Sequence, residues 1–555
     1  GFTLNNITML ALAVSTGIVI DDAIIVLENI FRHIEEKRRS PMEAAVTGAR
    51  EIGLAVMATT LSLVVIFLPV AFMGGLVGRF WQSFGLTATF AIMVSLFVAF
   101  TLTPMLASRF LRRAESEQGG EADNRSGQSK AAWWYRVMER GYEWLLIRCL
   151  RHRLLAVVSC LLIVTGTLYL ARGAQFDLGF DDDNSEFEVI VETPPGSSLA
   201  ESNAILRRIE ADTKQIPEVE HLFTTIGVRG QYRSNVTDGT IWVGLKPILE
   251  RERTQFDIMR EVRQRLKANY PDLRISAQRV NLISGGGFRA TPFNMVIRGP
   301  ELPKLDEYSQ TIIKRLVAIP GFVDVDTTQA YRQPEVQVRI DRKKAADLGV
   351  RVSDIASTLR TMVGGEKVGF YREGGEQYDV RLRLAEGFRQ DSSTLSALSV
   401  SAGGGRLVRL DNLSRFRDGT SPGQIDRYNQ ERQITVSANL DGKALGEAIQ
   451  QGNAIVRELR LPAEYSTSYI GRGKLLAEAL YNFLIAFALA VVFIYIVLAA
   501  QFESFVHPIT IMVSMFLAIP FGLLTLVVLG ISLNIYSIFG MFLLMGIVKK
   551  NAILQ

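Results

Sequence analysis

The feature that most constrains this chain is an apolar stretch with two adjacent acidic residues inside it. The stretch runs from Ile7 to Ile30 and reads ITMLALAVSTGIVIDDAIIVLENI. It is long enough to cross a bilayer, which takes about 20 mostly apolar residues. Asp21 and Asp22 lie only a few residues past its midpoint. An ionised Asp near the bilayer centre costs about 2.5–3.5 kcal/mol on insertion scales, and such residues usually mark ion or proton pathways. The alternative, a soluble core helix with a misplaced acidic pair, is disfavoured by the other apolar spans of the chain.

A second copy of this stretch closes the sequence, with a base where the first copy has an acid. The segment from Gly530, GISLNIYSIFGMFLLMGIVKKNAILQ, aligns with the start of the chain at a constant offset of 529, which places Lys550 opposite Asp21. Internal repeats related by pseudo-symmetry are typical of secondary transporters. We therefore predict that Lys550 lies within salt-bridge reach of Asp21 or Asp22, where it can neutralise the buried charge. Two roles remain open, a titrating site and a salt bridge that only pins two helices together.

The composition indicates membrane spans joined to a sizeable water-soluble part. Hydrophobic residues make up 48% of the 555 residues, yet 21% are charged. The net charge of +5 is spread along the chain without the basic tract of a nucleic-acid footprint, so no nucleic-acid partner is expected. The two cysteines, Cys149 and Cys160, lie beside or inside an apolar span, which argues against a disulfide framework. No Cys and His spacing typical of a metal site is present.

Hydropathy predicts seven membrane spans, of which the last is incomplete. They cover 7–30, 54–72, 86–106, 154–170, 480–500, 509–529 and 535 onward. After Pro41 we expect a short amphipathic helix, separate from the second span. Between the third and fourth spans, Trp133, Trp134, Tyr142 and Trp144 lie among arginines, as expected of an interfacial helix. The chain begins without a Met and stops inside an apolar helix, so we expect a fragment of a longer protein.

Charge in the loops predicts the orientation of the spans. Ten Lys or Arg lie between Arg109 and Arg153, whereas the turn near Gly74 has only Arg79. The positive-inside rule places the basic loops in the cytoplasm, so the region from about 172 to 474 lies on the outer side. The predicted boundaries are three spans in 1–108, a cytoplasmic loop and interfacial helix in 109–153, a span in 154–171 and three spans in 475–555.

The outer region is predicted to contain two α+β units and an insertion. The first, within 172–290, has strands at 187–193, 219–226, 240–246 and 274–278 and helices at 199–215 and 254–268. This order, β-α-β-β-α-β, is that of the split βαβ, or ferredoxin-like, motif. The second unit covers 291–340 and 419–474, and the segment 341–418 is inserted into it. The predicted fold class is a polytopic α-helical membrane protein with a large extracytoplasmic α+β region.

Four motifs carry a specific resemblance. VIDDAIIVLENI, VLAAQFESF, GIVKKNAIL and DRKKAADLGV, at these separations, resemble the resistance–nodulation–division (RND) transporters, most closely the hydrophobe/amphiphile efflux branch of Gram-negative bacteria. The resemblance covers essentially the whole chain, from the fourth membrane helix of the family to partway through the tenth.

The resemblance implies a secondary active transporter rather than an enzyme. Such a protein is a homotrimer in the inner membrane that expels drugs and other amphiphiles in exchange for protons, with no cofactor beyond the coupling ion. It works with a periplasmic adaptor and an outer-membrane channel and is surrounded by membrane lipids. Asp21 and Asp22 match the proton-binding carboxylates of the family, and Lys550 matches the lysine that faces them. The α+β units would be porter subdomains, and 341–418 would be a docking subdomain.

The resemblance also suggests substrate contacts in the first porter unit. Phe223 and Trp242 fall where the family places aromatic residues of a deep pocket, although core packing under the sheet is an equal alternative. The loop between them carries Val228 where drug pumps often have a phenylalanine, and it adds Arg229 and Tyr232. This departure puts a broadly apolar pocket in doubt.

Other functions remain as alternatives. A related branch exports metal ions through methionine ligands, but Met259, Met295 and Met362 are scattered without spacing that suggests a soft-metal site. An RND-type relative could also export lipids or act as a scaffold. An intramembrane aspartic protease needs two carboxylates that share a proton across a gap, whereas Asp21 and Asp22 are adjacent on one helix.

Overall fold

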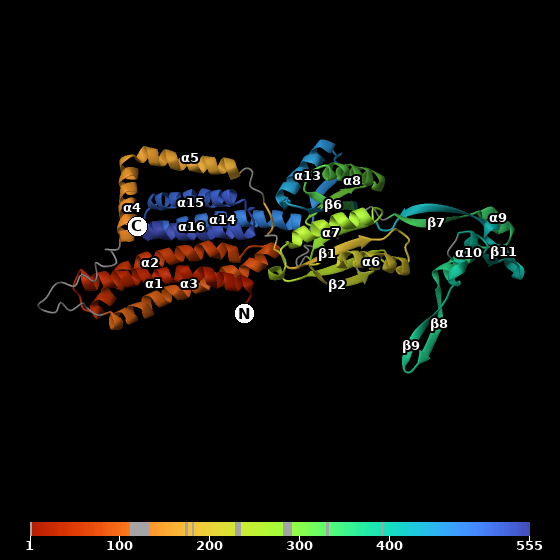
Figure 1. The fold of residues 1–555 in the computed structure, drawn as a ribbon, viewed down its shortest axis with the longest axis horizontal. Helices are drawn as coiled ribbons and strands as arrows, with labels where there is room; N and C mark the ends of the chain where they lie inside the picture. Colours follow the sequence, from red (N-terminus) through yellow and green to blue (C-terminus); the bar gives the residue numbers. More distant parts are fainter. Residues whose placement is uncertain are drawn as a thin grey trace.

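The structure is a computed structural model, and it describes residues 3–111, 133–171, 176–179, 182–227, 235–280, 291–328, 332–389 and 392–554. The molecule is elongated (Figure 1). A bundle of long helices occupies one end, two α+β units follow in the middle, and an inserted segment lies at the far end.

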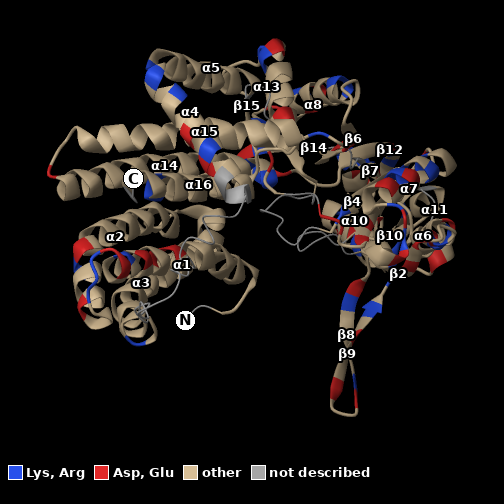
Figure 2. Ribbon diagram, turned by 60° about the vertical axis from the view of Figure 1, so that its left-hand side comes forward, with Lys and Arg blue, Asp and Glu red and all other residues tan. Residues whose placement is uncertain are grey.

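Within the part of the chain that the structure describes, the bundle contains seven helices that are long and apolar enough to cross a membrane. They are α1 (Asn6–Glu35), α2 (Pro41–Ala71), α3 (Gly75–Phe110), α5 (Arg153–Ala171), α14 (Arg472–Phe502), α15 (His507–Leu529) and α16 (Ile535–Leu554). Each contains or closely matches one predicted span. Most of their length is uncharged, and charged residues gather near the helix ends and on the α+β part (Figure 2).

One predicted boundary in the bundle is wrong. The segment after Pro41 is not a separate amphipathic helix but the beginning of α2. Ser40 caps this helix by accepting a hydrogen bond from the backbone N–H of Glu43, and Pro41 occupies its first turn, where the missing N–H costs nothing. No second proline follows before Pro69, so nothing in the chain ends the helix at the predicted junction.

A helix that does not align with the bundle precedes the fourth span. The helix α4 (Trp133–Arg151) runs across the end of α5 instead of continuing along the direction of the spans (Figure 1). Its described side chains, from 137 to 151, are exposed. This is the segment for which the sequence predicts an interfacial location.

The first α+β unit is a four-stranded antiparallel sheet with helices on one face. Its elements are β1 (Glu186–Glu192), α6 (Leu199–Lys214), β2 (Val219–Ile226), β3 (Asp238–Leu245), α7 (Gln255–Asn269) and β4 (Arg274–Arg279), and the strand order is β2-β3-β1-β4. Alternate residues of the central strands, such as Phe187, Val189 and Ile241, pack against Leu206 of α6 and Val262 of α7. Among the described residues, no helix of this unit covers the opposite face of the sheet.

The second unit has the same strand arrangement with a large insertion. Its elements are β5 (Phe293–Gly299), α8 (Leu302–Val317), β6 (Phe322–Thr327), β13 (Arg427–Tyr428), β14 (Glu431–Leu440), α13 (Leu445–Leu459) and β15 (Ser466–Tyr469). Strand β14 pairs with β5 and β6, and β5 pairs with β15. The resulting order, β6-β14-β5-β15, repeats that of the first sheet.

A long two-stranded ribbon carries the inserted segment. It consists of β7 (Arg332–Ile340) and β12 (Ser414–Pro422), so the departure from the second unit begins before the predicted boundary at Asp341. A small core beyond the ribbon contains Ile355, Val400 and Leu410. The helices and strands of this segment are α9 (Arg342–Asp347), α10 (Val352–Leu359), α11 (Ser392–Ser396), β10 (Ser399–Ser401), β11 (Leu407–Arg409) and α12 (Leu410–Leu413). A hairpin of β8 (Glu366–Glu373) and β9 (Glu376–Leu382) projects from it (Figure 1).

A buried carboxylate lies at the junction of the two α+β units. Asp324 of β6 is 1% exposed and accepts hydrogen bonds from Arg263 Nε at 2.9 Å and Lys267 Nζ at 2.8 Å, both on α7 of the first unit. Asn439 of β14 donates to the same carboxylate at 3.0 Å. A carboxylate with three donors from two units fixes their mutual position.

The second unit is also tied to the membrane bundle. Phe176 forms a bridge with Leu533, two residues before the start of α16, and the carbonyl of Phe176 accepts a hydrogen bond from the N–H of Gly446 in α13. Arg472, the first residue of α14, lies 3.7 Å from the carboxylate of Asp177. Phe176 therefore connects the segment that leads into α16 with the start of α13.

Candidate functional site: a buried acid–base pair between two repeated helices

The two repeated stretches begin as helices in the same way. Asn5 caps α1 by accepting a hydrogen bond from the N–H of Thr8, whose hydroxyl accepts from the N–H of Asn5. At α16, Asn534 and Ser537 exchange the same two hydrogen bonds. Both residues of the second pair lie 529 positions after those of the first. The internal repeat therefore extends from sequence to local geometry, because a reciprocal capping box starts both helices.

The predicted contact between the two repeats is confirmed. The Nζ of Lys550 lies 2.9 Å from Oδ1 of Asp22 and 3.6 Å from Oδ2 of Asp21. It also donates a hydrogen bond to the carbonyl of Ile18 at 3.2 Å, so the ammonium is held by one turn of α1.

The two adjacent carboxylates occupy different environments. Asp22 is fully buried, whereas Asp21 has a side chain that is 53% exposed within the described chain. Neighbouring residues on a helix point about 100° apart, so one of them faces the bundle interior and the other does not. Asp22 is thus the tightly held partner of Lys550, and Asp21 is the accessible one.

Two further helices complete the surroundings of Asp22, and sequence reasoning missed both contributions. Thr60 of α2 donates to Oδ2 of Asp22 at 3.3 Å, and Ser95 of α3 donates to the same oxygen at 3.4 Å. Each hydroxyl has a single proton, which it shares with a closer backbone carbonyl, that of Val19 at 3.0 Å from Ser95 and that of Val56 at 2.8 Å from Thr60. A hydroxyl near the middle of an apolar span is the signal that could have identified them, since such residues often hydrogen-bond across helices.

Lys549 is a second buried base that the sequence analysis did not single out. It is 1% exposed, and its Nζ has no hydrogen-bond partner among the described residues. An ammonium without a partner is costly to bury. It therefore differs from Lys550, which is matched by two carboxylates and a carbonyl.

Binding of a proton by Asp22 can weaken the ion pair between Asp22 and Lys550. An ionised Asp22 is compensated by Lys550 and two hydroxyls, all donated by helices other than its own. Protonation of the carboxylate removes one charge of the pair and leaves the ammonium less firmly held. Binding of one proton can thus change the packing of α1 against α16.

The predicted substrate residues fall into two groups. Val228, Arg229 and Tyr232 lie outside the described residues. Phe223 and Trp242 are directly opposite each other on β2 and β3. Phe223 is 65% exposed, and Trp242 lies on the sheet face that the helices do not cover. Core packing, the alternative for both residues, is therefore wrong.

The three methionines of the metal alternative do not come together. Met259 packs in the core of the first unit, Met295 packs in the core of the second, and Met362 lies in the inserted segment. No group of three or more His, Cys, Asp or Glu that could hold a metal ion occurs within the described ranges.

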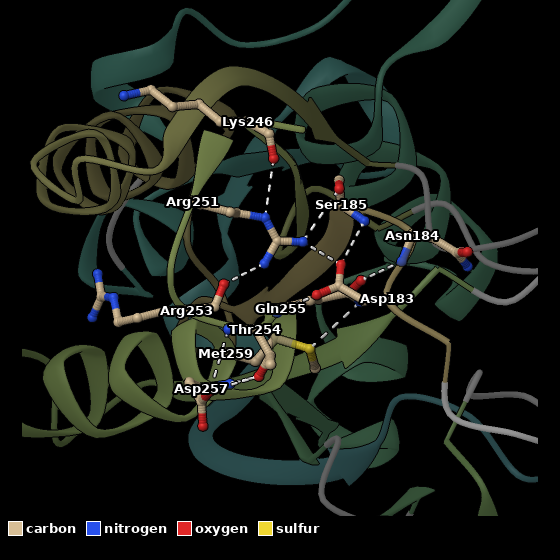
Figure 3. Close-up of polar contacts among 10 residues, drawn as sticks. All are labelled: Asp183, Asn184, Ser185, Lys246, Arg251, Arg253, Thr254, Gln255, Asp257 and Met259. Carbon is tan, nitrogen blue, oxygen red and sulfur yellow. Dashed lines mark hydrogen bonds and ion pairs between the residues drawn. The ribbon is translucent and has the colours of Figure 1, made fainter. Parts of the chain in front are cut away.

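Strand β1 starts from a rigid polar cluster (Figure 3). Asp183 pairs with the buried guanidinium of Arg251 and accepts hydrogen bonds from the N–H of Ser185 and Gln255. Burial raises the pKa of the Asp183 carboxyl, but these donors outweigh it and the pKa is lowered overall. Gln255 in turn accepts from the N–H of Asn184 at 2.9 Å. The backbone that leads into β1 is thereby fixed.

Comparison with known proteins identifies the family to which this chain belongs. A family model described as AcrB/AcrD/AcrF matches residues 1–555. The chain is similar to proteins named "Multidrug resistance protein MdtC" from Proteus mirabilis (strain HI4320), with 30% identity over 559 residues, and from Serratia proteamaculans (strain 568), also with 30% identity over 559 residues. Each alignment covers 100% of this chain and 53% of the relative, so the chain spans about half the length of these relatives. The buried acid–base pair, the helices that carry it and these matches together show that the chain belongs to the AcrB/AcrD/AcrF family of RND transporters.

Proposed function

We propose that this chain is part of a proton-driven exporter of amphiphilic or hydrophobic compounds in the inner membrane of a Gram-negative cell. The observation that carries the proposal is the buried pair of Asp22 and Lys550, formed by two helices of an internal repeat. Drug export is supported by the similarity of the chain to proteins named as multidrug resistance proteins.

In this proposal Asp21, Asp22 and Lys550 form the proton-binding site. Asp21 is the more exposed carboxylate and receives the proton first, whereas Asp22 holds Lys550 between cycles. When the carboxylates are protonated, the attraction for Lys550 weakens and α16 shifts relative to α1. The contact of Phe176 with Leu533 and Gly446 then carries this shift to the second α+β unit.

The outer region supplies the path for the cargo. We infer that the two α+β units are ferredoxin-like porter subdomains on the periplasmic side and that the inserted segment is a docking subdomain. The active assembly is then a homotrimer that acts with a periplasmic adaptor and an outer-membrane channel. The exposed hairpin β8–β9 and the long ribbon β7–β12 support a role in assembly, because both extend away from the compact units.

The alternatives are weaker on specific grounds. Export of metal ions lacks support from the methionines, which belong to separate packing units. An aspartic protease is disfavoured because Asp22 faces a lysine rather than a second carboxylate. Export of lipids remains the second candidate, since the same proton site could drive it.

The proposal is tested by efflux from cells that lack other pumps and express the complete gene product. We expect efflux of a cationic dye to stop when an uncoupler is added and to be lost in Asp22→Asn. The matched control is Glu28→Gln, which neutralises an exposed carboxylate two turns further along α1 and should retain efflux. If Asp22→Asn reaches the membrane and still exports the dye normally, the carboxylate is structural and the proposal fails.

A further inference from the structure

A column of buried polar side chains continues from Asp22 towards the C-terminal end of α1. Asp22, Asn29 and His33 are 0%, 7% and 1% exposed. Successive residues of an α-helix turn by about 100° and rise by about 1.5 Å, so Asn29 and His33 point within about 20° of the direction of Asp22. By the same geometry His33 is about 16 Å further along the axis. It lies at the end of the bundle for which the basic loops predict the cytoplasm.

His33 contacts two groups that make opposite demands on one ring nitrogen. Its Nε2 lies 2.5 Å from Oε2 of Glu51 on α2, and this contact needs a proton between the two atoms. The same Nε2 lies 3.1 Å from Nζ of Lys37, which can donate a hydrogen bond only to a nitrogen without a proton. Loss of the proton from Nε2 therefore exchanges Glu51 for Lys37 as the partner of the ring.

The other ring nitrogen of His33 is buried and unpaired. Its Nδ1 has no hydrogen-bond partner among the described residues. A buried polar atom without a partner is costly, and in a native structure it calls for an explanation. When the proton of a neutral imidazole is on Nε2, Nδ1 is a free acceptor. It is available to a proton that comes from the interior of the bundle.

Glu51 connects the buried imidazole with water. Its side chain is 43% exposed, whereas that of His33 is 1% exposed. Nη2 of Arg32 lies 3.4 Å from Oε1 of Glu51, and Nζ of Lys37 lies 3.5 Å from Oε2. Two neighbouring cations disfavour the neutral form of a carboxyl group. A proton that reaches Glu51 is therefore passed on to water rather than retained.

The other segments that pack around His33 are apolar or contribute backbone groups. The cluster at this end of α1 receives Ala99 and Ala107 from α3. The α1–α2 loop contributes the N–H of Arg39, which donates to the carbonyl of His33 at 3.3 Å. Among the described residues, Glu51 is the only acidic group that pairs with His33.

The contact between α1 and α2 is closed between Asp22 and His33. The Nδ2 of Asn29 donates to the carbonyl of Gly48 at 2.8 Å, and a Cβ on Gly48 would lie 3.2 Å from the Cα of Ile30. Ile30 is itself fully buried. Passage of a proton from Asp22 to His33 therefore requires α1 and α2 to move apart and admit water.

We propose that His33 and Glu51 form the exit by which the proton released by Asp22 leaves the bundle. Water between the separated helices carries this proton to Nδ1 of His33, which becomes an imidazolium. Nε2 then gives its proton to the carboxylate of Glu51, and Glu51 gives it to water, so one proton enters the ring and one leaves. Lys37 donates to the bare Nε2 until exchange through water returns the remaining proton from Nδ1 to Nε2. This inference rests on the proposed function, because it supplies the last step of proton transfer.

The test uses inside-out membrane vesicles from cells that express the complete gene product. In these vesicles the end of the bundle that carries His33 faces the medium, and a pH-sensitive dye is enclosed in an acidic lumen. The cargo is ethidium, and the readout is the ethidium-dependent loss of protons from the lumen into medium at about pH 8 or about pH 6. His33→Gln is the main variant, because its amide can still donate to Glu51 but cannot carry a proton.

We expect His33→Gln to slow this proton flux at least tenfold in medium at about pH 8 and less than about twofold at about pH 6. Histidine commonly changes charge between pH 5 and 8, so acidic medium keeps the wild-type ring protonated and removes its advantage. Glu51→Gln should slow the flux at least threefold at about pH 8. Glu43→Gln, which removes an exposed carboxylate in the first turn of α2, should leave the flux unchanged at both values.

Two outcomes overturn the inference. Wild-type flux in His33→Gln, with no flux in Asp22→Asn, would show that the proton leaves by another route. Slowing by the same factor at both pH values would show that His33 only joins α1 to α2, because a structural defect does not depend on the pH of the medium. Failure of the proposed function gives a different result, since Asp22→Asn would then retain the flux of the wild type.

Discussion

Asp21 and Asp22 are adjacent in the sequence, but their environments give the two carboxylates different exposure and different partners. The sequence predicts both the acidic pair and its partner Lys550, because the repeat aligns the two helices. It does not predict that Asp22 is buried and Asp21 is largely exposed, or that Thr60 and Ser95 hydrogen-bond to Asp22. Those features depend on the rotation of α1 relative to α2 and α3, which apolar spans of nearly uniform hydropathy do not encode.

Lys549 provides a prediction at this scale. Its buried amine has no partner among the described residues, and an unpaired buried polar group costs about 1–3 kcal/mol in proteins. We expect Lys549→Met, which keeps the length of the side chain, to raise the thermal unfolding midpoint while efflux remains coupled to the proton gradient. Lys550→Met is the matched comparison and should abolish coupling. Loss of coupling in Lys549→Met would instead make Lys549 a member of the proton site.

At the scale of helices and strands, the sequence predicts periodic segments well. It predicts less well whether two neighbouring segments form one continuous helix. Strand β2 has its predicted bounds, Val219–Ile226, because alternation and turn residues mark both ends. The sequence predicts a separate amphipathic helix after Pro41, but this segment is continuous with the apolar span in α2. A change from amphipathic to apolar composition does not require a break in a helix. The face on which Trp242 lies also became clear only from the register of β3 with β1.

The cluster that anchors β1 and α7 predicts a dependence on pH. The pKa of Asp183 is lowered in the folded protein, so its contribution to stability is present above the ordinary value of 3.8 and is lost as pH falls through the folded value. We expect the thermal unfolding midpoint of the wild type to fall between pH 5 and pH 3, and this fall to be smaller in Asp183→Asn. Asp272→Asn, at an exposed turn, should retain the full dependence. An identical pH profile for wild type and Asp183→Asn would contradict this role.

At the scale of the whole molecule, the sequence predicts the division into spans and α+β units but not the contacts between them. Asp324 helps to join the two units, and its partners Arg263 and Lys267 lie 61 and 57 residues away in the other unit. Asp324 also has a left-handed backbone, with φ of 52°. Neither property leaves a periodic signal in the sequence. The ion pairs depend on how the two units pack, and the left-handed residue lies at an irregularity in the pairing of β6 with β14.

The junction can be tested with a substitution that tolerates the same backbone. Asp324→Asn keeps the left-handed conformation, which asparagine adopts readily, but removes the charge that faces Arg263. Because removal of one partner of a buried pair costs about 3–5 kcal/mol, we expect faster hydrogen exchange in α7 and β6 and a lower unfolding midpoint. Asp441→Asn, which breaks only the exposed pair with Arg260, should cost about 0–1 kcal/mol. Equal effects of the two variants would show that Asp324 does not hold the units together.

The central claim, that Asp22 and Lys550 bind the proton that drives export, is tested most directly by proton movement itself. The complete purified protein would be reconstituted into liposomes that enclose a pH-sensitive dye, and cargo would be added under an imposed pH gradient. We expect cargo-dependent proton flux in the wild type and in Glu28→Gln, and none in Asp22→Asn. Cargo-dependent flux in Asp22→Asn at the rate of the wild type would show that the proton takes another route and would contradict the account.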